Sequence, residues 1–401
     1  MTNLKNAISL FRQGDFAAAK AEFSEIEIEL PEDKSLLLYS GYIALLENRL
    51  KAAEDYFQKV LARMPGSKSV KALLIDAYYR REDFVNASRL MKSTGRKSHA
   101  AKLDYLGTRK AYETISSTNR TELMFIKKDP LPLIKISINN AAPVYFIIDT
   151  GGGELILDSK YAGSLGLPEF GTDADIFGGG KRGTFIHSCV ESIRLGDFQV
   201  KHIPIMLMDL SKFSDRLFDD GLQVKGILGT CIFYHFLTTL DYRNDKIVFE
   251  YLNSNSGPER ENGQEKEGIQ QIPFWMAGDH LMLAKGKVNN GNEMLFLVDT
   301  GLAASSFTCP KATLNKYGFH LQKNKTGYGF GAGGKLKVIP FDIESLSLGG
   351  IQEHKLHGVF GPFPPSLEHA CGFKIGGLIS HEFFRNHTVK FDYRSMTLHI
   401  K

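Results

Sequence analysis

Two copies of one short acidic motif are the residues of this chain best suited to chemistry. The triplets are Asp149-Thr150-Gly151 and Asp299-Thr300-Gly301, and each directly follows an apolar run, 144–148 or 294–298. Such a run predicts a buried strand, and a carboxylate at its end is costly unless something holds it or uses it. Two carboxyl groups that face each other and share one proton can act as an acid and a base. The pattern therefore predicts that Asp149 and Asp299 form a single acid pair.

The segments that follow each triplet also occur twice. A glycine cluster comes first, then an apolar segment that contains glycine, and finally Asp-Tyr-Arg. The matched pairs are 177–181 with 330–335, 226–233 with 377–384, and 241–243 with 392–394. The offset is 150 residues for the triplets and 151 for the last pair. A repeat at a nearly fixed offset indicates that two half-chains share one β-rich plan.

This duplicated pattern resembles the aspartic peptidases, and within them the bacterial retropepsin-like branch that carries two lobes in one chain. The resemblance covers about residues 122–401. It implies that the two aspartates are the catalytic acids. The residues implied to lock the two loops together, or to leave room for the substrate backbone, are Thr150, Thr300, Gly151 and Gly301.

The two glycine clusters fit this resemblance as paired flaps, because glycine permits positive φ angles and lets a hairpin move over a bound peptide. The flap candidates are Gly178, Gly179 and Gly180 in the first half, and Gly331, Gly333 and Gly334 in the second. Both clusters satisfy the spacing G-x-G-x-x-G, but neither stands between a buried strand and a helix, so a dinucleotide site is not expected. Residues 227–229 match the family's apolar-apolar-Gly segment, whereas Ser380 stands where the second copy should have glycine.

The resemblance also implies a reaction, the hydrolysis of peptide bonds by an activated water without a metal or other cofactor. The ionised aspartate would take a proton from the water, and the protonated one would hydrogen-bond the peptide carbonyl oxygen. Gly152 and Leu302 follow the triplets, where relatives often carry a hydroxyl that bonds to the pair. We therefore expect the pair to lose its first proton at a higher pH and to work nearer neutrality. These residues and Ser380 leave open an alternative, a non-catalytic scaffold that keeps the fold and binds an extended peptide.

The first hundred residues follow a different rule, a period of 34 residues. The residues that recur at this spacing are Phe16, Leu50 and Phe84, and three alanines, Ala19, Ala53 and Ala87. The period matches tetratricopeptide repeats, helical hairpins in which small residues let paired helices approach closely. We expect three hairpins and a capping helix within 98–115, which fold on their own and dock a protein partner or a substrate.

These patterns predict a multidomain protein in which helical repeats precede an all-β, two-lobed region with pseudo-twofold symmetry. The expected parts are a repeat domain at 1–115, a first lobe at 122–252, an interlobe linker at 253–268 and a second lobe at 269–401. The linker is predicted from its polar and charged composition, which is nearly free of apolar residues.

Composition limits the partners that the chain is expected to have. A net charge of +4 over 401 residues, without a Lys/Arg-rich run, does not favour nucleic acid. No apolar stretch has the length of a signal peptide or a membrane span, so a cytoplasmic protein without a membrane partner is expected. The four cysteines lie far apart without metal-ligand spacing, which predicts reduced, mostly buried thiols. The expected partner is therefore a peptide or protein substrate.

Overall fold

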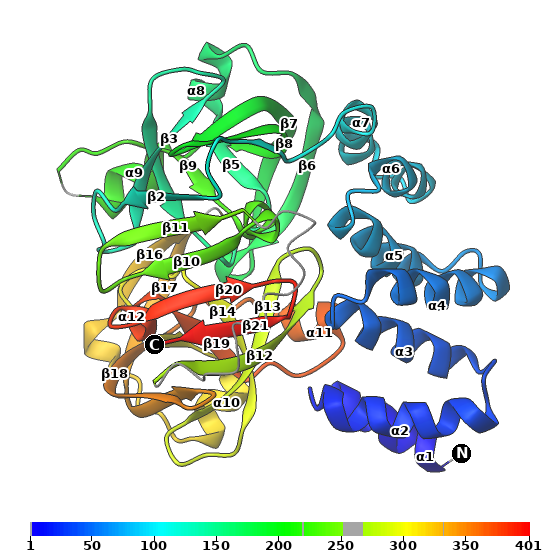
Figure 1. Cartoon of the computed structure of the whole chain (residues 1–401). Helices are drawn as coiled ribbons and strands as arrows, with labels where there is room; N and C mark the ends of the chain where they lie inside the picture. Colours follow the sequence, from blue (N-terminus) through cyan, green and yellow to red (C-terminus); the bar gives the residue numbers. More distant parts are fainter. Residues whose placement is uncertain (1, 219, 252–267, 332) are drawn as a thin grey trace.

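The computed structural model describes residues 2–218, 220–251, 268–331 and 333–401 (Figure 1). Within these ranges, seven helices come first and a β-rich region of two lobes follows. This order confirms the predicted fold class, helical repeats ahead of a bilobal β fold. The predicted interlobe linker falls, apart from Gly268, outside the described residues.

The helices form antiparallel hairpins that stack into one array, named here the helical array (α1–α7). Their bounds are α1 (Thr2–Arg12), α2 (Phe16–Glu29), α3 (Lys34–Leu46), α4 (Leu50–Arg63), α5 (Lys68–Arg80), α6 (Phe84–Ser93) and α7 (Lys97–Leu106). The carboxylates of Asp15 and Asp83 cap the N-termini of α2 and α6. Each of the three repeating alanines is completely buried, as close packing of paired helices requires.

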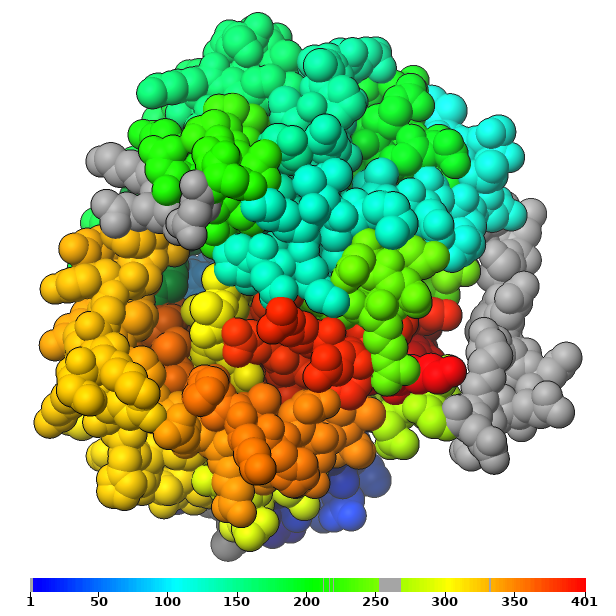
Figure 2. Space-filling model, turned by 90° about the vertical axis from the view of Figure 1, so that its left-hand side faces the viewer, coloured from blue at the N-terminus to red at the C-terminus, as the bar shows by residue number. Residues whose placement is uncertain are grey.

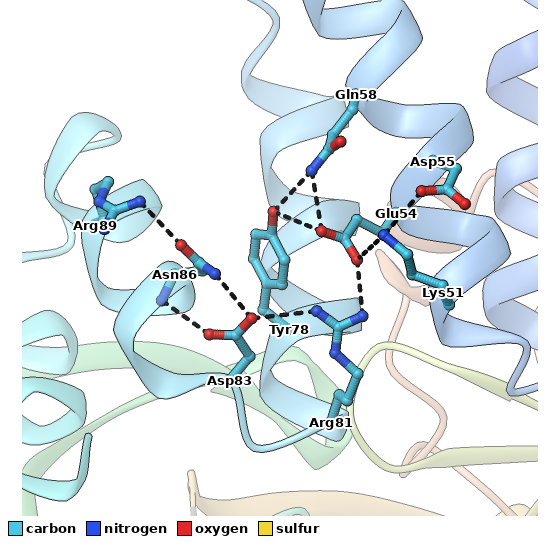
Figure 3. A network of polar contacts seen from close by, with 9 residues as sticks. All are labelled: Lys51, Glu54, Asp55, Gln58, Tyr78, Arg81, Asp83, Asn86 and Arg89. Carbon is cyan, nitrogen blue, oxygen red and sulfur yellow. Dashed lines mark hydrogen bonds and ion pairs between the residues drawn. The ribbon is translucent and has the colours of Figure 1, made fainter. Parts of the chain in front are cut away.

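A polar network ties consecutive hairpins of the array together (Figure 3). Glu54 of α4 accepts hydrogen bonds from Arg81 at 2.7 Å and from the hydroxyl of Tyr78 at 3.3 Å. Arg81 also pairs with Asp83 at 3.1 Å, and Asp83 in turn accepts the backbone N–H of Asn86 at 3.2 Å. Charge-assisted bonds of this kind fix the relative placement of α4, α5 and α6.

The first lobe is built on an eight-stranded sheet with the order β1-β8-β5-β9-β4-β3-β7-β6. Its strands are β1 (Glu113–Ile115), β3 (Leu133–Ile138), β4 (Val144–Ile148), β5 (Leu155–Asp158), β6 (Glu169–Phe177), β7 (Lys181–Leu195), β8 (Phe198–Met208) and β9 (Val224–Leu228). Two short helices, α8 (Ser159–Ser164) and α9 (Ser211–Leu217), follow β5 and β8 in the chain. Because β1 pairs with β8, the change from helix to sheet lies between Leu106 and Glu113.

The second lobe and the connection between the lobes share a thirteen-stranded sheet, β16-β17-β18-β15-β19-β14-β13-β12-β21-β20-β10-β11-β2. The strands of the second lobe are β12 (Gln270–Ala277), β13 (Leu281–Val288), β14 (Met294–Asp299), β15 (Phe307–Thr308), β16 (Gly327–Gly331), β17 (Gly334–Leu348), β18 (Ile351–Phe360), β19 (Gly377–Ser380), β20 (Thr388–Asp392) and β21 (Thr397–Ile400). The first half contributes β2 (Arg120–Met124), β10 (Leu237–Asp241) and β11 (Lys246–Glu250). The antiparallel pair β10–β20, from Thr238↔Phe391 to Asp241↔Thr388, joins the two halves.

The helical array lies along one side of both lobes (Figure 1). Near its N-terminus, Phe16 packs edge to face on Phe373 of the second lobe, with ring centroids 4.9 Å apart. In its middle, buried Arg80 donates to the carbonyl oxygen of Met276 at 3.2 Å. At its other end, α7 packs on β6, β7 and β8 of the first lobe. Apolar clusters run without a break from the array into each lobe, and the independent folding of the repeats stays a prediction.

Two further features bear on the sequence-based expectations. None of the helices in the described ranges combines the length and the apolar composition needed to span a bilayer. All four cysteines are free and buried, in agreement with the prediction, and burial raises the pKa of each thiol. Neutral, buried thiols are inert structural residues.

Candidate active site

The two Asp-Thr-Gly loops meet at the centre of the lobes. Strand β4 runs parallel to β9 and β14 runs parallel to β19, and each triplet follows the carboxyl end of the first strand of its pair. The N–H of Thr150 donates to the hydroxyl oxygen of Thr300 at 3.1 Å, and the N–H of Thr300 donates to that of Thr150 at 2.9 Å. Both threonines are buried. This reciprocal pair of bonds locks the loops together, as predicted.

The lock brings the carboxyl groups of Asp149 and Asp299 into hydrogen-bonding contact. In each loop, the glycine N–H donates back to the aspartate Oδ1, from Gly151 at 2.8 Å and from Gly301 at 2.7 Å. A Cβ atom on Gly151 would lie 2.4 Å from Oδ2 of Asp299, and one on Gly301 would lie 2.1 Å from Oδ1 of Asp149. Only glycine permits this approach, so the triplet is an arrangement for pairing two acids.

Both acids hold a proton more tightly than an exposed carboxyl group. Desolvation raises the pKa of Asp149, although hydrogen bonds from Asp299 and from the amides of Gly151 and Gly152 act to lower it. The pKa of Asp299 stands well above its usual range, because desolvation is joined by the negative charge of Asp149. The pair as a whole therefore keeps a proton to a higher pH than two separate carboxyl groups would. Burial is the largest cause in both cases, and an effect of the missing hydroxyls after the triplets stays a prediction.

The predicted flap glycines lie at the tips of two hairpins. Gly178–Gly180 turn the chain between β6 and β7, and Gly331 pairs with Gly334 where β16 turns into β17. The tips bridge the lobes, because the N–H of Gly179 donates to the carbonyl oxygen of Pro362 at 2.6 Å. A Cβ on Gly333 would lie 2.5 Å from the Cβ of Lys181 on the first hairpin. The two hairpins therefore touch each other across the lobes.

Each triplet loop is braced from behind, and the braces differ. In the first lobe, a Cβ on Gly229 would lie 2.3 Å from the carbonyl oxygen of Gly153, so the brace and the loop are in backbone contact. In the second lobe, the hydroxyl of Ser380 donates to the carbonyl oxygen of Asp299 at 2.6 Å and accepts the N–H of Leu302 at 3.2 Å. The residue that departs from the family pattern is thus a buried, fully bonded support of its loop.

Sequence reasoning missed a charged pair beside the acids, Asp279 and His280, at the turn between β12 and β13. The imidazole Nδ1 contacts the Asp279 carboxylate and lies 3.0 Å from where a Cβ on Gly153 would stand. Desolvation acts to lower the pKa of His280, but the charges of Asp279, Asp149 and Asp299 raise it overall. In turn, His280 lowers the pKa of both triplet acids. The available signal was a break in the repeat, since the equivalent of His280 in the first half is Pro130.

A second missed residue is Glu154, which follows the first triplet loop and is buried. Its carboxylate pairs with Lys102 and accepts the hydroxyl of Tyr79, both from the helical array. The position equivalent to Glu154 in the second half is Ala304. The loss of charge between the two copies is again the signal that could have pointed to it.

On the side away from the array, the surface is hollowed between the lobes, and blue atoms of the array show at the bottom of the hollow (Figure 2). Among the described residues, no group of three His, Cys, Asp or Glu side chains is placed to hold a metal ion. Asp241, in the duplicated Asp-Tyr-Arg segment, caps a turn by accepting the N–H of Asn244 at 3.2 Å.

The aspartyl protease family model matches the chain twice, at residues 134–231 and 284–382. Each match contains one triplet, one glycine-tipped hairpin and one bracing segment, and neither includes the helical array. The match supports an aspartic-protease-like fold for the two lobes. No match was found among curated proteins.

Proposed function

We propose that this chain is an aspartic endopeptidase of the two-lobed, retropepsin-like kind, with Asp149 and Asp299 as its catalytic dyad. The observation that supports it most is the reciprocal threonine lock, which sets two buried carboxyl groups in hydrogen-bonding contact with each other. A protein that merely bound a peptide would not need to desolvate two acids together. The hydrolase and peptidase character follows the family match.

The proposed reaction assigns one role to each acid. Ionised Asp149 takes a proton from a water molecule as the water oxygen attacks the carbonyl carbon of the scissile peptide bond. Protonated Asp299 donates a hydrogen bond to the carbonyl oxygen and stabilises the charge that develops there. The C–N bond then breaks as a proton passes from the dyad to the leaving nitrogen. Gly151 and Gly301 keep the dyad accessible, and the two flaps close over the peptide.

The role of the repeats is part of the same proposal. The 34-residue spacing and the complete burial of the repeating alanines support tetratricopeptide repeats. A docking role would fall to their outer faces, because α7 packs on the first lobe and α3 on β12 of the second. Exposed apolar residues of α2 and α6, Ile28 and Val85, are available there.

A digest of a diverse peptide mixture, read by mass spectrometry, tests the activity. Wild-type protein should cut peptides internally, and Asp149→Asn or Asp299→Asn should reduce the rate by about 10²–10⁴-fold, the usual contribution of a general acid or base. Unchanged cleavage by either variant would exclude the dyad. If the wild type retained peptides without cutting them, the non-catalytic scaffold would be the correct function.

A further inference from the structure

A buried ion pair joins the helical array to the loop that follows the first triplet. Nζ of Lys102, on α7, lies 2.7 Å from Oε1 of Glu154, and the side chains are 0% and 5% exposed. The hydroxyl of Tyr79, on α5, donates to the same carboxylate oxygen at 2.5 Å. Glu154 stands five residues after Asp149 in the chain. A buried ion pair adds little net stability over an apolar pair of the same shape. What the ion pair contributes instead is a fixed geometry between α7 and the loop.

The same helix also holds the first flap. His99 of α7 stacks on His187 of β7, with ring centroids 4.5 Å apart, and His187 bonds to Asp173 of β6 at 2.9 Å. The preceding residue, Ser98, donates its hydroxyl to the carbonyl oxygen of Thr172 at 3.4 Å. Both strands of the first flap therefore rest on α7. Nε2 of His99 lies 3.9 Å from the Glu154 carboxylate, so the flap contact and the loop contact adjoin.

We propose that Lys102 is a positioning residue of the active site, and that α7 fixes the position of the first flap relative to the first aspartate loop. Lys102 touches neither catalytic acid and acts through Glu154. The helical array is then an integral part of the peptidase unit rather than a detachable adaptor. The second half has no equivalent of this contact, because Ala304 stands in place of Glu154. This inference rests on the proposed function for its kinetic consequence, but not for its structural one.

The structural consequence is tested by hydrogen–deuterium exchange on full-length protein carrying Asp149→Asn, so that the result does not depend on activity. Adding Lys102→Met should speed amide exchange about tenfold in residues 150–158 and 169–187, since their opening becomes local. Exchange in the second flap, 327–340, should not change. Lys92→Met is the matched control, because it removes an exposed ion pair of the same array, with Asp104. Tyr79→Phe, which keeps the ion pair, should act in the same direction and more weakly.

The kinetic consequence is tested in the active protein. Lys102→Met should lower kcat by about 10²-fold with KM nearly unchanged, as expected when a reacting group is displaced by about 1 Å. Lys92→Met should leave both constants unchanged. The proposal is overturned if exchange in the two segments is unaltered, or if it rises equally in the second flap, which would show general destabilisation. If the wild type does not cleave peptides, only the proposed function fails, and the exchange result still decides the role of α7.

Discussion

The two aspartate loops have the same lock but different supports. The first loop lies against the bare backbone of Gly229 and is tied through Glu154 to the helical array. The second loop is tied within its own lobe by the buried hydroxyl of Ser380. A duplicated sequence therefore preserved the contact that both copies must share. The supports diverged because the array offers a charged partner to only one loop.

The largest effect is expected when the brace of the first loop, Gly229, is replaced by the serine found at the brace of the second loop. In Gly229→Ser, the new Cβ would stand 2.3 Å and 2.6 Å from the carbonyl oxygens of Gly153 and Glu154, and backbone atoms cannot move aside cheaply. We expect a loss of about 3 kcal/mol or more and a Tm lower by at least about 5 °C, measured by calorimetry. A serine tolerated here without a change in Tm would show that the two loops are interchangeable.

A fall in pH should destabilise the first lobe, where it packs on α7, before it destabilises the second lobe. Burial lowers the pKa of His187 to about 4, and burial with the nearby Lys102 charge lowers that of His99 well below its usual value. Unfolded histidine titrates near 6.5, so the unfolded state binds the proton first. Stability is then full above about pH 6.5 and falls as the pH drops toward 4, by roughly 3 kcal/mol for His187 alone.

Denaturant unfolding between pH 7 and 4.5 measures this loss, and exchange at pH 5 locates it. Residues 97–106 and 169–187 should open before any segment of the second lobe. His187→Gln should flatten the pH dependence, since it removes the titrating group. An earlier opening of the second lobe would contradict the assignment of the acid-sensitive contact to α7 and the first flap.

The reverse exchange in the second lobe should cost less. Ser380→Gly leaves the carbonyl oxygen of Asp299 and the N–H of Leu302 without the bonds they now have. We expect a loss of about 1–3 kcal/mol, the cost of unsatisfied buried polar groups, and a smaller fall in Tm than in Gly229→Ser. Ser380→Ala separates the hydroxyl from the backbone effect of glycine. If Ser380→Ala were as stable as the wild type, the hydroxyl would not be the support of this loop.

The features that both halves share were those predictable from the sequence. The acid pair, the threonine lock and the flap tips each occur twice, so the duplication itself exposed them. The features that belong to one half were not. Glu154 and His280 stand where the other copy has Ala304 and Pro130. The partner of Glu154, Lys102, lies 52 residues away in the chain, and His280 lies beside Gly153 of the opposite lobe. Tertiary packing creates such contacts, and no local periodicity records them. The independence of the repeats was inferred from their period, which describes how the helices stack on each other but not what covers their inner faces.

The smallest effect should come from His280, and it concerns the pH profile rather than stability. The His280 side chain is 27% exposed, the charges of Asp279, Asp149 and Asp299 raise its pKa, and its positive charge acts to lower the pKa of both acids. The first half has no counterpart, since Pro130 occupies the equivalent turn. In His280→Asn, the dyad loses a nearby positive charge and should keep its first proton to a higher pH. The acidic limb of kcat/KM, which reports the free enzyme, should therefore move upward, with the maximal rate almost unchanged.

His357→Asn is the matched control, because that exposed imidazole pairs with Asp342 on β17. A limb that stayed in place would mean that solvent screens His280 from the dyad. A wild-type maximum at about pH 3–4, the range of unperturbed carboxyl groups, would contradict the raised pKa of the dyad itself.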